Sequence, residues 1–216
     1  MVGAPGAGKG TQAALLAARL GLAHIASGDL FREVATRDTP IARQVRAAME
    51  RGELVPDDVT VRLVLERLER PDAAAGAILD GFPRTRPQAE ALDAALVKRG
   101  ARVDQALYIG VREPELRRRL SGRWLCRAAG HPYHLTEHPP RLPGICDLDG
   151  SPLYQRDDDR PETVQARLTK QLPPMYEVVD HYTERGVLTA VDGEQPIDDV
   201  TAALVRAIAL IPAASR

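Results

Sequence analysis

Short apolar runs alternate with stretches of helical periodicity along most of the chain. The runs at 77–79, 106–109 and 187–191 have the length of buried strands. Apolar residues recurring at helical spacing predict helices over residues 11–20, 59–70, 86–99 and 197–211. Because this alternation is typical of a parallel sheet wrapped by helices, the sequence predicts an α/β fold.

The stretch from residue 122 to residue 159 has a different texture. It is rich in Pro, Gly and His, shows little helical period and contains both cysteines, Cys126 and Cys146. Such a composition predicts an inserted module of turns and short strands. Two cysteines are too few for a disulfide framework, so in a reducing compartment we expect them to be free or metal-bound.

Composition narrows the classes of function. The chain has 216 residues, 44% of them hydrophobic, which is enough for one substantial core. Its 29 basic side chains nearly balance 30 acidic ones, so we expect no broad basic face for nucleic acid or an anionic membrane. No apolar run approaches the roughly 18 residues of a membrane span, and no charged, apolar leader opens the chain. We therefore expect a cytoplasmic protein.

The strongest chemical signal is a glycine-rich loop at residues 3–11, GAPGAGKGT, which runs into a predicted helix. Free backbone N–H groups and the helix dipole bind phosphate in such a loop, and Lys9 can reach the β and γ oxygens. Gly10 stands where the general pattern has Ser or Thr, so we expect magnesium to be held through water and phosphate. A plain helix-capping turn is disfavoured because Lys9 directly follows Gly8.

The start of the chain does not fit this pattern. A phosphate loop normally follows a strand of about five residues, but only Met1 and Val2 precede Gly3. We expect either that the first strand is cut short or that the true start lies upstream, and we favour a misassigned or truncated start.

A second candidate segment, Asp80 to Arg84, follows the predicted strand at 77–79. Open α/β sheets bind ligands at the carboxyl ends of their strands. Asp80 can hold magnesium through water molecules, and Arg84 can clamp a phosphate group. For this segment alone, a strand that simply ends in a Gly-Pro turn is an equally good interpretation.

Together these motifs resemble the long-lid bacterial adenylate kinases of the nucleoside monophosphate kinase family. The resemblance covers nearly the whole chain and includes the glycine-rich loop, SGDLFR at 27–32, DGFPRT at 80–85, Gly122-Arg123 and YQRDDD at 154–159. It implies a P-loop NTPase core with a parallel sheet flanked by helices, and two insertions. The core would comprise residues 1–25, 56–121 and 160–216, the AMP-binding domain 26–55, and the lid 122–159.

The resemblance also implies an activity. A monomer would transfer the γ-phosphoryl group of magnesium-bound ATP reversibly to AMP, giving two ADP. Two alternatives remain open. A kinase for UMP or CMP is disfavoured because those relatives typically have a short lid. An ATP-binding module, inactive because its first strand is truncated, is disfavoured by the lid arginines, which a pure binder does not need.

Site residues follow from the resemblance position by position. The AMP site would contain Ser27, Arg32, Glu53, Leu54, Val55, Gly81, Phe82, Pro83, Arg84 and Gln88, together with Arg156 and Arg167. Gln88 would bind the adenine edge. The ATP site would contain Gly6, Ala7, Gly8, Lys9, Gly10, Thr11, Arg119, Arg123, Pro132, Tyr133 and the backbone near Gln195.

The catalytic set consists of cations. Phosphoryl transfer depends mainly on alignment and on stabilising charge on the equatorial oxygens, a task that suits arginine. The expected catalytic residues are Lys9, Arg84, Arg123, Arg156 and Arg167. No general base is needed, because the attacking oxygen of AMP already belongs to a phosphate.

Some lids of this family bind zinc through a pair of four-residue knuckles. Cys126, Cys146 and Asp149 match three of the ligand positions, but the fourth is Ala129. A structural zinc site needs four ligands, so His131, or failing that His134, would have to supply the last one. The alternative is a lid held by packing and hydrogen bonds, with two free thiols.

Overall fold

The fold is taken from a computed structural model that describes residues 1–51 and 53–209. The chain divides into two compact units, one formed by Met1–Val111 with Lys170–Arg216 and the other by Arg112–Thr169. Each unit is described by itself.

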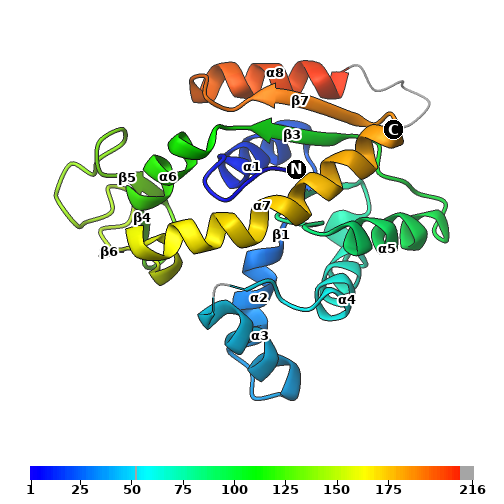
Figure 1. Cartoon of the computed structure of the whole chain (residues 1–216), viewed down its shortest axis with the longest axis horizontal. Coiled ribbons are helices and arrows are strands. Elements are labelled where there is room, and N and C mark those ends of the chain that lie inside the picture. The colour runs from blue at the N-terminus through cyan, green and yellow to red at the C-terminus, as the bar shows by residue number, and fades with distance from the viewer. Residues whose placement is uncertain (52, 210–216) are drawn as a thin grey trace. The chain divides into compact units, whose positions relative to one another are not determined.

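Parallel strand pairs form the framework of the first unit (Figure 1). Strand β1 (Ala23–Ala26) pairs with β2 (Ala77–Asp80), and β3 (Ala106–Gly110) pairs with β7 (Leu188–Asp192). The three predicted strands are therefore confirmed, each within one residue at either end. β1 was not predicted, because its sequence AHIA is only four residues long and is interrupted by His24.

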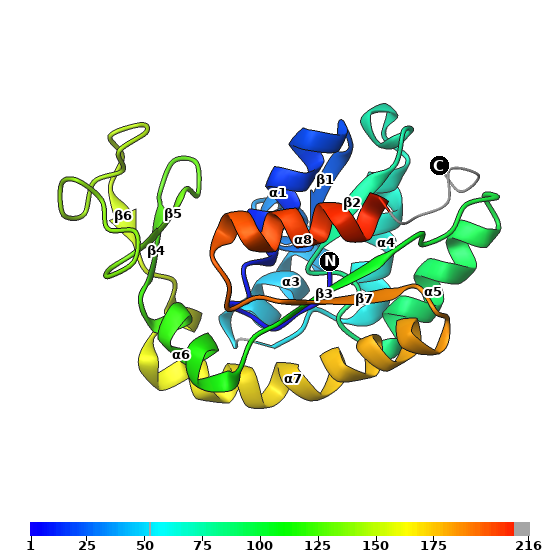
Figure 2. The same cartoon turned by 90° about the horizontal axis from the view of Figure 1, so that it is seen from above.

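The helices of the first unit are α1 (Lys9–Leu20), α2 (Ser27–Ala35), α3 (Pro40–Glu50), α4 (Asp57–Leu68), α5 (Arg86–Val97), α8 (Ile197–Ala209) and the later part of α7 (Pro161–Glu184), with a 3₁₀ turn at Pro71–Ala73. Helix α8 packs beside α1 and β7, and α4 packs beside α5 (Figure 2). All four predicted helices are present with shifted ends, and the predicted end of the last one, at 211, lies outside the described residues. Thr85 caps α5 by accepting a hydrogen bond from Gln88 N at 3.3 Å.

The two residues before the glycine-rich loop make a single β-bridge. Val2 N donates to Leu107 O at 2.8 Å, and Ile109 N donates to Val2 O at 3.0 Å. On the other side, the Met1 amino group donates to Leu79 O at 2.8 Å. Met1 and Val2 thus lie between β2 and β3, where one parallel bridge occupies the place of the expected strand.

Residues 26–55 carry a small apolar cluster of their own. Phe31 and Val34 on α2 pack against Ala42, Val45 and Ala48 on α3. The Thr39 hydroxyl caps α3 by accepting from Ala42 N at 3.1 Å. This cluster gives the α2–α3 segment a local reason to fold as a helical pair.

The second unit is built around a short antiparallel sheet. Its elements are α6 (Glu113–Ser121), β4 (Arg123–Cys126), β5 (Pro132–His134), β6 (Leu153–Tyr154), a 3₁₀ turn at Asp157–Asp159 and the early part of α7, with strand order β5-β4-β6. The short strands predicted between 122 and 159 are confirmed.

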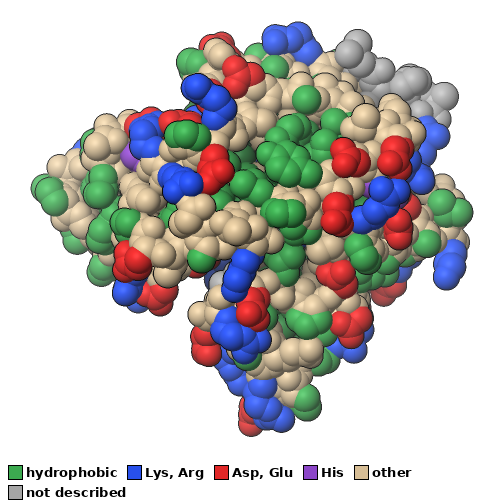
Figure 3. All heavy atoms as spheres, in the orientation of Figure 1, with side chains coloured by type: hydrophobic (Ala, Val, Ile, Leu, Met, Phe, Trp, Pro, Cys, Tyr) green, Lys and Arg blue, Asp and Glu red, His purple; other side chains and the backbone are tan. Residues whose placement is uncertain are grey.

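Charges are mixed on the surface. On the face drawn in Figure 3, acidic and basic side chains lie interspersed, as the near-equal numbers predict. Within residues 1–51 and 53–209, no helix combines the length and the apolar character needed to cross a bilayer.

A buried polar pair joins α5 to α7. His181 Nε2 lies 2.8 Å from Asp93 Oδ2, and both side chains are buried. Arg185 Nε lies 3.3 Å from the same oxygen. A buried carboxylate is costly unless it keeps its partners, so this contact should contribute to the stability of the first unit.

We expect His181→Ala to lower the free energy of unfolding by about 2–4 kcal/mol, because it leaves Asp93 without its closest partner and opens a cavity. Arg102→Ala is the control, since Arg102 pairs with Asp104 in an exposed position and should change stability by no more than about 0.5 kcal/mol. Chemical denaturation of both variants measures the difference. Equal changes in the free energy of unfolding for the two variants would show that the buried pair stabilises the fold no more than an exposed ion pair does.

Candidate functional site

The phosphate loop has the backbone that anion binding requires. Gly6 has a φ of 83° and Gly8, which caps α1, has a φ of 90°. These left-handed conformations favour glycine and turn the chain sharply into α1. The N–H groups of the first helical turn have no partner within their own helix and can bind phosphate oxygens. Lys9 Nζ donates to Ala4 O at 2.8 Å, so the lysine side chain lies back along the loop.

Asp80 lies at the end of β2 and close to this loop. A Cβ atom added to Gly10 would lie 3.3 Å from Asp80 Oδ2, which gives a steric reason why this position lacks the usual Ser or Thr. Burial opposes ionisation of Asp80, but the interaction with His24 and the charge of Lys9 prevail and lower its pKa. The site therefore holds an ionised carboxylate, a ligand that suits hydrated magnesium.

The residues after β1 and β2 meet at the same edge of the sheet. The buried Ser27 Oγ donates to Gly81 O at 2.7 Å, and Arg84 Nε donates to the same oxygen at 2.7 Å. Gly81 has a φ of 68°, and an added Cβ would lie 3.0 Å from atoms of both side chains. Ser27, Gly81 and Arg84, all predicted for the AMP site, thus form one contact group. Arg32 pairs with Asp29 on the same helix and is half exposed.

Some predicted AMP-site residues use their side chains elsewhere. Phe82 is only 1% exposed and packs with Val64 and Leu92. Val55 is buried in the α2–α3 cluster. Glu53 is exposed and pairs with Arg51. The hydrogen bond from Arg51 lowers the pKa of Glu53. For Phe82 and Val55, a contact with a nucleotide would have to come from the main chain.

In the second unit, two of the predicted catalytic arginines share one carboxylate. Arg123 binds Asp159 through two hydrogen bonds, Nε to Oδ2 at 2.8 Å and Nη2 to Oδ1 at 2.6 Å. Arg167 Nη1 donates to Asp159 Oδ1 at 2.8 Å. The Asp159 side chain is fully buried. Sequence reasoning did not assign Asp159 a role, although it ends the acidic run that follows Arg156.

The environment of Arg167 favours an anion. Burial and the like charges of Arg123 and Arg156 lower its pKa, while Asp158 and Asp159 act in the opposite direction. Its Nε is buried and has no hydrogen-bond partner among the described residues. A buried donor without a partner is costly unless a ligand or water fills the gap.

Three other residues predicted for the ATP site form hydrogen bonds with residues of their own unit. Arg119 Nε donates to Glu115 Oε1 at 2.6 Å, and hydrogen bonds from Arg118 and then Arg119 lower the pKa of Glu115 to about 2. Tyr133 is buried beside the two cysteines, where its hydroxyl accepts from Asp147 N at 2.7 Å. Gln195 in the first unit is exposed and donates to Asp192 at 2.8 Å.

Four candidate metal ligands converge in the second unit. Cys126, His131, Cys146 and Asp149 each offer a ligand atom, and these atoms lie within 4.8 Å of one another. His131 Nδ1 lies 3.3 Å from Cys146 Sγ and 3.4 Å from Asp149 Oδ2. His134, the other candidate for the fourth position, instead accepts a hydrogen bond from Thr136 N.

The surroundings of both sulfur atoms suit thiolate ligands. Ala129 N donates to Cys126 Sγ at 3.3 Å, and Leu148 N donates to Cys146 Sγ at 3.4 Å. Burial and the contact with Asp149 raise the pKa of Cys126, but hydrogen bonds from Ser151 and the main chain outweigh them and lower it to about 7. Two sulfurs, an imidazole and a carboxylate form a donor set that fits tetrahedral zinc.

Comparison with known proteins agrees with this geometry. The family model described as adenylate kinase matches residues 1–187. An adenylate kinase of Staphylococcus aureus strain Mu50 is 46% identical over 201 residues, covering 93% of this chain and 94% of its own. The adenylate kinase of Lachnospira eligens is 46% identical over 206 residues, which cover 95% of this chain and 97% of its own. That of Staphylococcus epidermidis is 45% identical over 201 residues, which cover 93% of this chain and 94% of its own. Because the family model matches most of the chain and these relatives are at least 45% identical over 93% or more of it, the chain belongs to the adenylate kinase family.

Proposed function

We propose that this chain transfers the γ-phosphoryl group of magnesium-bound ATP reversibly to AMP, giving two ADP. The observation that carries the proposal is the arrangement within the first unit. A phosphate loop that opens α1 adjoins an ionised Asp80, and the Ser27–Gly81–Arg84 contact group follows at the carboxyl ends of the neighbouring strands. Membership of the family supports the same activity.

The roles of the residues follow the chemistry. The loop from Gly6 to Thr11, with Lys9, would bind the ATP phosphates, and Arg32 and Arg84 would hold the phosphate of AMP. Arg119, Arg123, Arg156 and Arg167 would surround the transferring group, where their fixed charge stabilises the equatorial oxygens. Pro132, Tyr133 and Gln195 would contact ATP through the main chain, since the Tyr133 side chain is used within its own unit.

Magnesium would be held through water by Asp80. Held there, the ion would supply positive charge that neutralises the phosphates. The crowding at Gly10 supports water-mediated binding, because a hydroxyl side chain at that position would press against the carboxylate.

The proposed domains are an AMP-binding segment at 26–55 and a lid at 122–159, acting on a core made of the remaining residues. Closure of such segments excludes water, which directs the phosphoryl group to AMP instead of to hydrolysis. We further propose that the enzyme is a cytoplasmic monomer whose partners are ATP, AMP and ADP.

We also propose a structural zinc ion bound by Cys126, His131, Cys146 and Asp149. Four protein ligands close the coordination shell and leave no open position for substrate. Such an ion would tie the β4–β5 turn to the loop before β6 and thereby stabilise the lid.

Incubation with ATP, magnesium and each of AMP, UMP, CMP and GMP in turn should give rapid ADP formation with AMP alone. Coupled detection of ADP measures the rates. Equal or faster turnover with UMP or CMP would replace the proposal by a pyrimidine nucleotide kinase, and ATP binding without turnover would favour an inactive binding module.

Arg84→Ala and Arg123→Ala should each lower kcat/KM for AMP by about three orders of magnitude, because each removes a fixed charge next to the reacting phosphates. Arg117→Ala is the control, since Arg117 pairs with Glu113 on an exposed helix face, and it should change the rate by less than about twofold. If the first two variants lose only a few-fold, their catalytic role is wrong.

Protein purified with zinc present should retain an equimolar amount of the metal after dialysis. Cys126→Ser and His131→Ala should lose it, and both should unfold at a lower temperature because metal binding is coupled to lid stability. His134→Ala, which alters a nearby histidine outside the cluster, should keep the metal. Elemental analysis decides the matter, and a metal-free wild type or a metal-free H134A variant would contradict the assignment.

A further inference from the structure

The side-chain amide of Gln88 is held at both ends. Its Nε2 donates to Asp57 Oδ1 at 2.7 Å, and its Oε1 accepts from Arg84 N at 2.8 Å. The side chain is 1% exposed. Asp57 comes from the first turn of α4 and Gln88 from the first turn of α5, so the contact joins two helices that pack side by side.

These two partners allow only one orientation of the amide. A carboxylate can only accept hydrogen bonds, and a backbone N–H can only donate. If the amide were turned over, its oxygen would face the Asp57 carboxylate and its NH₂ group would face the Arg84 N–H. Both contacts would be repulsive in a buried position, where unmade hydrogen bonds are expensive.

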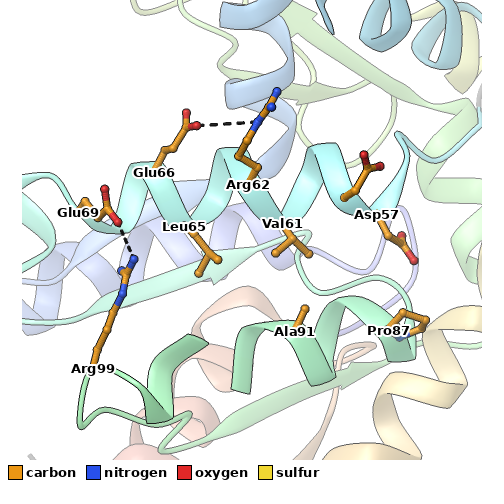
Figure 4. A pocket seen from close by; sticks show the side chains of 10 residues that line it. Asp57, Val61, Arg62, Leu65, Glu66, Glu69, Pro87, Ala91 and Arg99 are labelled. Atoms are coloured by element: carbon orange, nitrogen blue, oxygen red, sulfur yellow. Dashed lines mark hydrogen bonds and ion pairs between the residues drawn. The ribbon is translucent and has the colours of Figure 1, made fainter. Parts of the chain in front are cut away.

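Asp57 is itself fixed by a second hydrogen bond. Thr85 Oγ1 accepts from Gln88 N at 3.3 Å, so its own proton is available to Asp57 Oδ2, which lies 2.9 Å away. Figure 4 shows Asp57 at the start of α4, opposite Pro87 at the start of α5. Both carboxylate oxygens are therefore committed, one to Thr85 and one to Gln88.

We infer that Asp57 is a positioning residue that sets the purine specificity of the acceptor site. The inference rests on the proposed function, in which Gln88 binds the base of AMP. With its orientation fixed, the Gln88 amide keeps one N–H and one oxygen lone pair. Adenine offers the matching edge, a 6-amino donor beside the N1 acceptor. A 6-oxopurine offers the reverse, an oxygen acceptor beside an N1–H donor, and can pair only with the overturned amide.

A purely structural role for Asp57 would have different consequences. Asp57 and Asp58 are both acidic residues in the first turn of α4, where either can stabilise the helix dipole. Only Asp57 bonds to Gln88, whereas Asp58 is exposed. Asp58→Asn is therefore a matched control that removes the same charge from the same helix end.

The test compares AMP with inosine monophosphate (IMP), which differs from AMP only in the polarity of the base edge. Asp57→Asn keeps the shape of the side chain but replaces one acceptor-only oxygen by an NH₂ group, which can donate to an overturned Gln88. In this variant only the Arg84 N–H still opposes the overturned amide. We expect D57N to lower the ratio of kcat/KM for AMP to that for IMP by about tenfold or more, mainly through KM for the nucleotide. D58N should keep the wild-type ratio.

The outcomes separate this inference from the proposed function. If the wild type does not prefer AMP to IMP, the proposed adenine contact itself fails. If the wild type prefers AMP and D57N keeps that preference, or if D58N loses it equally, the positioning role of Asp57 is overturned. Circular dichroism checks folding. Should D57N not fold, Thr85→Val replaces it, because loss of the hydroxyl frees Asp57 to move and should shift the ratio in the same direction.

Discussion

Parallel pairing of β1 with β2 is the constraint on which the acceptor side of the site depends. The register places Ala26 opposite Asp80, so the residues that follow the two strands emerge side by side. Ser27 and Gly81 then meet through a hydrogen bond of 2.7 Å. This contact brings the start of α2 and the segment that carries Arg84 to the same edge as Asp80, close to the phosphate loop. A shift of one residue in the register would turn the side chains of the shifted strand to the other face of the sheet and would separate Ser27 from Gly81.

Carboxylates orient the groups that would handle the nucleotides. Asp159 holds Arg123 and Arg167, Asp57 holds Gln88, and Asp80 remains ionised near Lys9. In the first two cases an acceptor-only carboxylate fixes a cation or an amide, which would otherwise sample several rotamers. Preorganisation of this kind is what phosphoryl transfer requires, because little covalent work is left to the protein.

The short sheet of the second unit is stabilised by more than apolar packing. The apolar cluster at this sheet consists of Cys126, Tyr133 and Cys146, with Trp124 and Leu153 packed against it, while the other buried apolar residues of the unit include Leu116, Leu120, Val164 and Leu168 on its helices. A sheet with so small an apolar cluster gains stability from additional cross-links. The convergence of two sulfurs, an imidazole and a carboxylate supplies groups for one, and the main-chain N–H bonds to both sulfurs hold the ligands in place.

The sequence by itself determined what depends on neighbouring residues. The phosphate loop is a run of consecutive residues, and the apolar runs and helical periods are local, so the loop, three strands and four helices were predictable. Only the tertiary structure decided the partners of the polar side chains. Asp57 and Gln88 are 31 positions apart, and Arg123 and Asp159 are 36 apart. Phe82 turned inward for the same reason. The sequence offered both His131 and His134 as the fourth metal ligand, and the tertiary structure brings His131 to the other three candidates. Which buried groups meet is set by the packing of whole elements, and no local pattern in the sequence records that packing.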